Sequence, residues 1–116
     1  MIDRGPLTTH VLDISVGRPG VGITIILARK SGDDSWETLS SATTDADGRA
    51  GGFVEAATFT PAVYRLTFAI GDYYRTRDVA SFYPSVAIEF QVSSTSEHYH
   101  VPLLLSPHGY STYRGS

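Results

Sequence analysis

Hydrophobic and polar positions alternate with a period of two along most of the chain. Residues 62–70 (AVYRLTFAI) show this most cleanly, with Tyr, Leu, Phe and Ile at every second position and Val, Arg, Thr and Ala between them. Such alternation is typical of a β-strand that buries one face. The same signal predicts further strands at 7–15, 21–30, 36–45, 85–93, 98–106 and 110–114. Residues 71–82 are the stretch that fits a short helix.

Turn residues separate these segments, in SVGRPG, SGDDS and DADG. Seven or eight short strands at regular spacing, with one short helix at most, indicate a β-sandwich. A chain of 116 residues with 41% hydrophobic and 18% charged residues fits an ordinary globular protein. The sequence therefore predicts an all-β sandwich in a single domain over residues 1–116.

One strand carries an unusual second face. Alternate residues of 98–106 form an apolar core face, namely Tyr99, Val101, Leu103 and Leu105. The opposite face holds His98, His100, Pro102 and Leu104, which is not typical of a solvated surface. Residues 7–15 also place a histidine, His10, beside a leucine on one face. Half-apolar faces of this kind usually meet a partner subunit or a ligand.

Charge and composition exclude several classes of protein. The net charge is −3 and no basic run exists that could follow a phosphate backbone, so no nucleic-acid partner is expected. No segment reaches transmembrane length and the N-terminal residues lack the apolar stretch of a signal peptide, so we expect a cytoplasmic protein without a membrane partner. The chain has no cysteine, which excludes disulfides and thiolate chemistry.

The candidate chemistry lies in histidines, one arginine and the chain end. His98 and His100 share a strand face, a spacing that metal sites use, and His10 would be the third ligand that such a site needs. Arg49 follows a turn and, on the residues alone, is best interpreted as a solvated side chain. The terminal YSTYRGS crowds tyrosines, an arginine and hydroxyls into seven residues. No nucleophile elbow or phosphate-binding loop is present.

Five segments together resemble the 5-hydroxyisourate hydrolases, the transthyretin-related enzymes of urate breakdown: THVLDISVGRPG, DADGR, YRLTF, HYHVPLLLSP and YSTYRGS. The resemblance covers residues 7–116 and keeps the order of the family's motifs, with Thr8 where a serine is common. It implies a transthyretin-like sandwich of two four-stranded antiparallel sheets with one short helix. It also implies a homotetramer, a dimer of dimers with a channel between facing sheets.

The resemblance further implies a reaction and a site. The substrate would be 5-hydroxyisourate and the product 2-oxo-4-hydroxy-4-carboxy-5-ureidoimidazoline, a step of purine degradation without metal or cofactor. The implied catalytic residues are His10, Arg49, His100 and Ser116, and the implied substrate contacts are His10, Arg49 and Tyr113. Strict alternation places Tyr113 on the channel side of the last strand and Ser116 on the other side, and a curled chain end would bring Ser116 back to the site.

Two other functions stay open at this point. The first is a carrier of hydrophobic ligands, because transthyretin itself uses the same channel for binding. The vertebrate carrier lacks the histidine, arginine and YRGS set that this sequence retains. The second is a metal-dependent hydrolase with His10, His98 and His100 as ligands. Activity after exhaustive chelation distinguishes the second from a metal-free enzyme.

Overall fold

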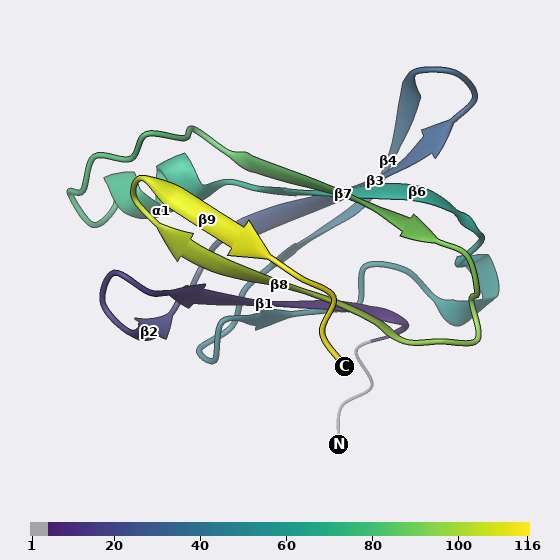
Figure 1. The fold of residues 1–116 in the computed structure, drawn as a ribbon, viewed down its shortest axis with the longest axis horizontal. Helices are drawn as coiled ribbons and strands as arrows, with labels where there is room; N and C mark the ends of the chain where they lie inside the picture. Colours follow the sequence, from purple (N-terminus) through teal and green to yellow (C-terminus); the bar gives the residue numbers. More distant parts are fainter. Residues whose placement is uncertain (1–4) are drawn as a thin grey trace.

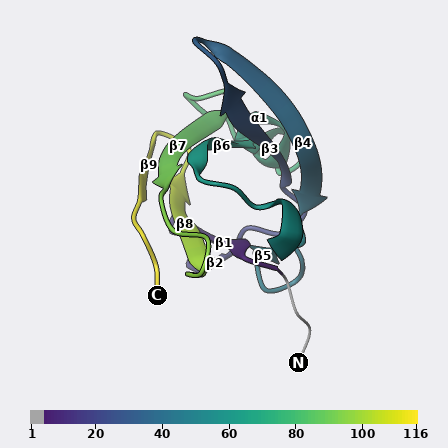
Figure 2. The ribbon, with the colours of Figure 1, turned by 90° about the vertical axis from the view of Figure 1, so that its right-hand side faces the viewer.

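A computed structural model describes residues 5–116, which form two β-sheets packed face to face (Figures 1 and 2). The strands in this range are β1 (Leu7–Asp13), β2 (Arg18–Pro19), β3 (Thr24–Ser31), β4 (Ser35–Thr43), β5 (Arg49–Ala50), β6 (Ala62–Phe68), β7 (Val86–Val92), β8 (Tyr99–Ser106) and β9 (Gly109–Thr112). The helices are α1 (Ile70–Arg75) and the single 3-10 turn η1 (Ala56–Thr58). The all-β sandwich with one short α-helix that the sequence predicts is confirmed.

The sheets differ from the expected pair of four-stranded antiparallel sheets in two details. One sheet has five strands, in the order β2-β1-β8-β9 with β5 also paired to β1, whereas the other has the order β4-β3-β6-β7. In addition, β1 and β8 are parallel, whereas the other pairs are antiparallel. The two-residue strands β2 and β5 are too short to show a period of two, and alternation contains no information on the direction of pairing.

The core lies between the sheets and contains the faces that alternation predicts. On β6 the side chains of Tyr64, Leu66 and Phe68 are fully buried, and on β8 those of Leu103 and Leu105 are fully buried. Burying a Leu or Phe side chain stabilises a fold by about 1.5–3 kcal/mol. Because both faces of the core are continuous, the strands cannot slip by one residue without exposing them.

The short helix closes one end of the sandwich (Figure 1). It buries Ile70, Tyr73 and Tyr74, and the Tyr73 hydroxyl donates a hydrogen bond of 2.9 Å to the buried carboxylate of Asp13 at the end of β1. Burial and this carboxylate raise the pKa of Tyr73 to about 12. Within residues 5–116 no helix has the length and apolar character needed to cross a membrane.

The parallel pairing of β1 with β8 brings distant residues together on the outer face of the five-stranded sheet. Thr8 is the register partner of His100, and His10 is the partner of Pro102. On its other edge β1 pairs with β5, where His10 is opposite Arg49. Three segments that lie far apart in the sequence thus meet over a few residues of β1.

Candidate active site

A hollow of about 230 Å³ lies at this meeting point, and its lining comes from β1, β5, β8 and the C-terminus: Thr8, Thr9, Arg49, Ala50, His98, His100 and Ser116. Ligand pockets for drug-sized molecules enclose about 300–1,000 Å³. The volume therefore suits a small molecule, and the lining is rich in groups that donate or accept hydrogen bonds.

His98, just before β8, and His100, on β8, are joined through a threonine. The Thr8 hydroxyl lies 2.8 Å from Nε2 of His98 and 2.8 Å from Nδ1 of His100. His100 is half-buried whereas His98 is exposed. No other hydrogen bond of the His100 ring occurs within residues 5–116, so its Nε2 is available to a ligand.

His100 is held in its neutral form. Burial lowers its pKa below the ordinary value of 6.5, and the positive charge of Arg49 lowers it further, followed by His10 and His98. A cationic imidazole would have to lose hydration and lie close to a guanidinium, and both effects disfavour it. At pH 7 the ring is therefore neutral and able to accept a proton.

Arg49 is positioned by the turn that precedes β5. The carboxylate of Asp45 accepts hydrogen bonds from the backbone N–H groups of Asp47 (2.9 Å) and Arg49 (3.0 Å). Gly48 has a φ of +77°, and a Cβ there would lie 2.5 Å from the Val11 carbonyl oxygen. Only glycine fits this close approach, so the DADGR motif fixes the backbone that carries Arg49. Within residues 5–116 its guanidinium makes no ion pair or hydrogen bond, which leaves its donors for a ligand.

His10 lies beside the hollow and not in its lining. Its Nε2–H donates a 2.9 Å hydrogen bond to the backbone carbonyl of Asp47, which leaves Nδ1 as its acceptor nitrogen. The ring is close enough for its positive form to lower the pKa of His100. His10, His98 and His100 are thus near one another, but no group of three or more metal-ligating side chains within residues 5–116 is arranged to hold a metal.

The C-terminal segment packs directly against His100 on the outer face of the five-stranded sheet. The Gly115 N–H donates a 2.8 Å hydrogen bond to the His100 carbonyl. A Cβ on Gly115 would lie 2.6 Å from Cδ2 of His100, so any larger residue would displace the imidazole. Ser116 follows and lines the hollow.

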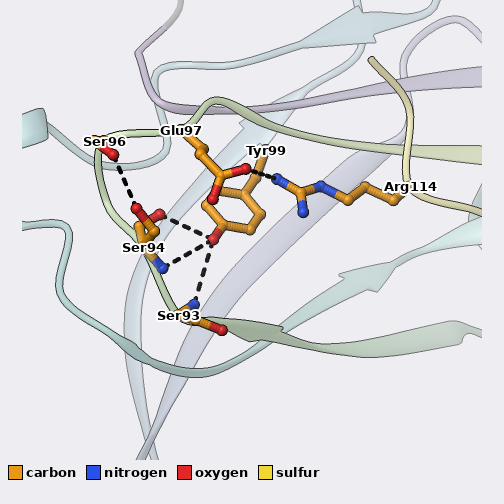
Figure 3. A network of polar contacts seen from close by, with 6 residues as sticks. All are labelled: Ser93, Ser94, Ser96, Glu97, Tyr99 and Arg114. Atoms are coloured by element: carbon orange, nitrogen blue, oxygen red, sulfur yellow. Dashed lines mark hydrogen bonds and ion pairs between the residues drawn. The ribbon is translucent and has the colours of Figure 1, made fainter.

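Figure 3 shows how this segment is held in place. The Arg114 guanidinium donates to the Glu97 carboxylate at 3.2 Å and lies 4.5 Å from the centre of the Tyr99 ring. The Tyr99 hydroxyl in turn donates to the carbonyl of Ser94 (2.9 Å) and accepts the N–H groups of Ser93 and Ser94. Arg114 thus fastens the chain end to the loop before His98.

The side chains of Tyr113 and Ser116 do not follow strict alternation. Tyr113, expected on the same side as the channel, is 57% exposed and borders a different hollow beside β7, whereas Ser116 lies at the histidines. The regular strand β9 ends at Thr112, and Gly115 then forms an isolated antiparallel bridge with His100 in the same register, so Gly115 keeps the expected face whereas Tyr113 does not line the hollow. The structure brings Arg49, His100 and Ser116 together with His10 nearby. The role of Tyr113 in binding substrate stays a prediction.

The sequence assigns no role in the site to Thr8 or, individually, to Gly115. Thr8 shares a strand face with His10, and the resemblance marks it only as a position where serine is common. Its contact with both histidines depends on the parallel register of β1 and β8, which the sequence pattern does not contain. Gly115 has no side chain that could indicate a function, and it matters because the imidazole of His100 packs against its backbone.

The fold and this outer-face site define a transthyretin-like protein. Residues 7–115 match the model of the HIUase/Transthyretin family, and the chain belongs to that family. A 5-hydroxyisourate hydrolase of Pseudomonas aeruginosa is 48% identical over 117 residues, covering 97% of this chain and 92% of that protein. The resemblance inferred from the motifs is confirmed.

Solved structures agree with this assignment. The 5-hydroxyisourate hydrolase of Klebsiella pneumoniae is 38% identical, with a TM-score of 0.82 over 95% of this chain and 98% of the other. Sea bream transthyretin in complex with thyroxine is 27% identical, with a TM-score of 0.90 over 95% of this chain and 94% of the other. The fold alone is thus shared by enzymes and a ligand-binding protein, and function depends on the site.

Proposed function

We propose that this protein hydrolyses 5-hydroxyisourate to 2-oxo-4-hydroxy-4-carboxy-5-ureidoimidazoline. The observation that carries the proposal is the convergence of Arg49, His100 and Ser116 on one hollow, with His10 beside it. Strand pairing brings these positions together, but it does not require an arginine, a histidine and a serine there. The hydrolase names of relatives 43–48% identical to the chain support the same reaction.

The chemistry follows from the state of each group. Neutral His100 takes a proton from water through Nε2 as the water oxygen bonds to the carbonyl carbon of the cyclic amide. Arg49 donates hydrogen bonds to the oxyanion that forms on that carbon. The carbon–nitrogen bond then breaks, and the imidazolium returns its proton to the leaving nitrogen. Ser116 and His10 hold the substrate's polar edge, and neither metal nor cofactor takes part.

The proposed assembly is a homotetramer in which the outer faces of two five-stranded sheets form a channel. Leu12 and Leu104 are half-buried register partners on this face, further along β1 and β8 than the hollow. A second copy of the chain on this face would bury both leucines and keep them from water. The cytoplasmic location expected from the sequence stays a prediction.

A thyroxine-type carrier is the competing function, because sea bream transthyretin in complex with thyroxine has nearly the same fold. A carrier has no need of a neutral imidazole beside a guanidinium that forms no ion pair with any residue of 5–116. The polar lining of the hollow also favours a polar, planar substrate over a hydrophobic hormone.

The test is the absorbance decay of freshly generated 5-hydroxyisourate with and without the protein. Hydrolysis predicts decay well above the buffer rate, and the rate should persist after exhaustive treatment with a chelator. Decay at the buffer rate would refute the enzyme and favour the carrier. Activity that disappears on chelation and returns with added zinc would instead support the metal-dependent alternative.

A further inference from the structure

The Thr8 hydroxyl lies between two imidazoles and contacts one nitrogen of each. Its distances to Nε2 of His98 and Nδ1 of His100 are both 2.8 Å, which is a normal hydrogen-bond length. The contact is built into the sheet, because Thr8 is the parallel register partner of His100. The β-branched side chain has few rotamers, so the hydroxyl stays between the rings.

The protons available on the Thr8 hydroxyl and on the two imidazole nitrogens limit which group donates each hydrogen bond. A hydroxyl has one proton to donate, and each nitrogen of a neutral imidazole either carries a proton or accepts one. Thr8 can donate to at most one ring, and within residues 5–116 its hydroxyl has no other hydrogen-bond partner. Its proton is therefore used when it donates to one ring and accepts from the other, and in that arrangement the tautomer of one histidine determines that of the other.

The surroundings of His100 favour one of the two directions in which the hydrogen bonds through Thr8 can run. In the first, His100 donates from Nδ1, so its Nε2 is a bare acceptor toward the hollow that Arg49 lines. In the second, His98 donates and His100 is left with a proton on Nε2, on a ring that shares the hollow with the Arg49 guanidinium. A bare lone pair is the better neighbour for a cation. The exposed His98 ring can adopt either tautomer, because water satisfies its remaining nitrogen.

We propose that Thr8 is a positioning residue that accepts the Nδ1–H of His100 and donates to Nε2 of His98, which leaves Nε2 of His100 bare as the proton acceptor. The catalytic consequence rests on the hydrolase function proposed above, whereas the tautomer is a property of the resting protein. Thr8 acts through His100 and contacts no reacting atom. A merely structural threonine would satisfy its hydroxyl in either direction and would leave the tautomer of His100 free.

The test compares Thr8→Val, which keeps the shape and removes the hydroxyl, with Thr8→Ser, which keeps the hydroxyl. Thr67→Val is the matched control, because Thr67 is a half-buried threonine on β6 in the other sheet. Long-range proton–nitrogen spectra of protein labelled with ¹⁵N-histidine report the ring tautomers without substrate. Steady-state kinetics with 5-hydroxyisourate then separates kcat from KM, and thermal unfolding confirms that each variant is folded.

We expect wild type, Thr8→Ser and Thr67→Val to show His100 with its proton on Nδ1. Thr8→Val should lose that signature and about tenfold in kcat, the effect of one hydrogen bond, with KM nearly unchanged. A wild-type His100 protonated on Nε2 would overturn the proposal, as would wild-type kcat in Thr8→Val or failure of serine to restore it. If the wild type does not hydrolyse 5-hydroxyisourate, the catalytic role of Thr8 fails with the proposed function, and the spectra still decide the hydrogen-bond direction.

Discussion

At the scale of single residues, the two histidines of HYH differ in burial and in what they contact. His100 is half-buried, neutral and lies against Gly115, whereas His98 is exposed. We expect His100→Asn to keep the fold and to lower the rate by roughly two to four powers of ten, the usual effect of a positioned acid–base group. His98→Asn should cost much less, because the Thr8–His100 hydrogen bond remains. Single-turnover rates and metal content of both variants test this, and equally severe losses with release of metal would favour a metal centre.

Arg49 contributes both a charge and a planar set of donors. Arg49→Lys keeps the charge, so the pKa of His100 should stay below its ordinary value, as it is in the wild type. It replaces a two-pronged donor by a point charge, and we therefore expect most of the activity to be lost. The measurements are kcat and its pH profile, where kcat should fall while the acidic limb stays in place. Near wild-type turnover in the lysine variant would show that Arg49 is a solvated turn residue without a catalytic role.

At the scale of elements, periodicity predicted what depends on local sequence. The buried faces of β6 and β8 follow from alternate apolar residues and need no knowledge of neighbours. By contrast, β5 is two residues long and exists because it pairs with β1, so no local pattern indicates it. The same holds for the parallel register that places Thr8 beside His100. The site residues themselves were found through the family motifs, since each is a common residue in an ordinary strand or turn.

The terminal segment shows where alternation stops being informative. Its residues follow a strand that ends at Thr112, and their positions depend on contacts with β8 and with the loop around Glu97. Ser116 reaches the hollow because Gly115 fits against the His100 ring, not because of its place in a period of two.

We therefore expect Arg114→Gln to loosen the chain end. The substitution removes an exposed ion pair with Glu97 and the stacking of the guanidinium on Tyr99, and each contact stabilises the segment by at most about 1 kcal/mol. The value of kcat/KM should fall by about three- to tenfold, because Gly115 and Ser116 are less often in place. Arg75→Gln is the control, since Arg75 makes a similar exposed pair with Asp72 on α1. Equal activity of the two variants would show that the contacts of Arg114 with Glu97 and Tyr99 are not needed to hold the terminal segment in place.

At the scale of the whole molecule, the hollow lies open on a face that also carries half-buried leucines. A single chain leaves this face in water, and a facing copy would enclose the site and exclude bulk solvent from the reaction. Enclosure strengthens the hydrogen bonds from Arg49 to a developing oxyanion, because the local dielectric constant falls. Assembly and activity should therefore be linked.

The protein should accordingly have a mass in light scattering of about four times the 12.6 kDa of its chain. On dilution the specific activity should fall in parallel with the mass, because each site loses the face that covers it. The measurement is a dilution series in which scattering mass and hydrolysis rate are recorded on the same samples. A monomer at micromolar concentration, or full activity in samples that have dissociated, would contradict a channel formed between facing sheets.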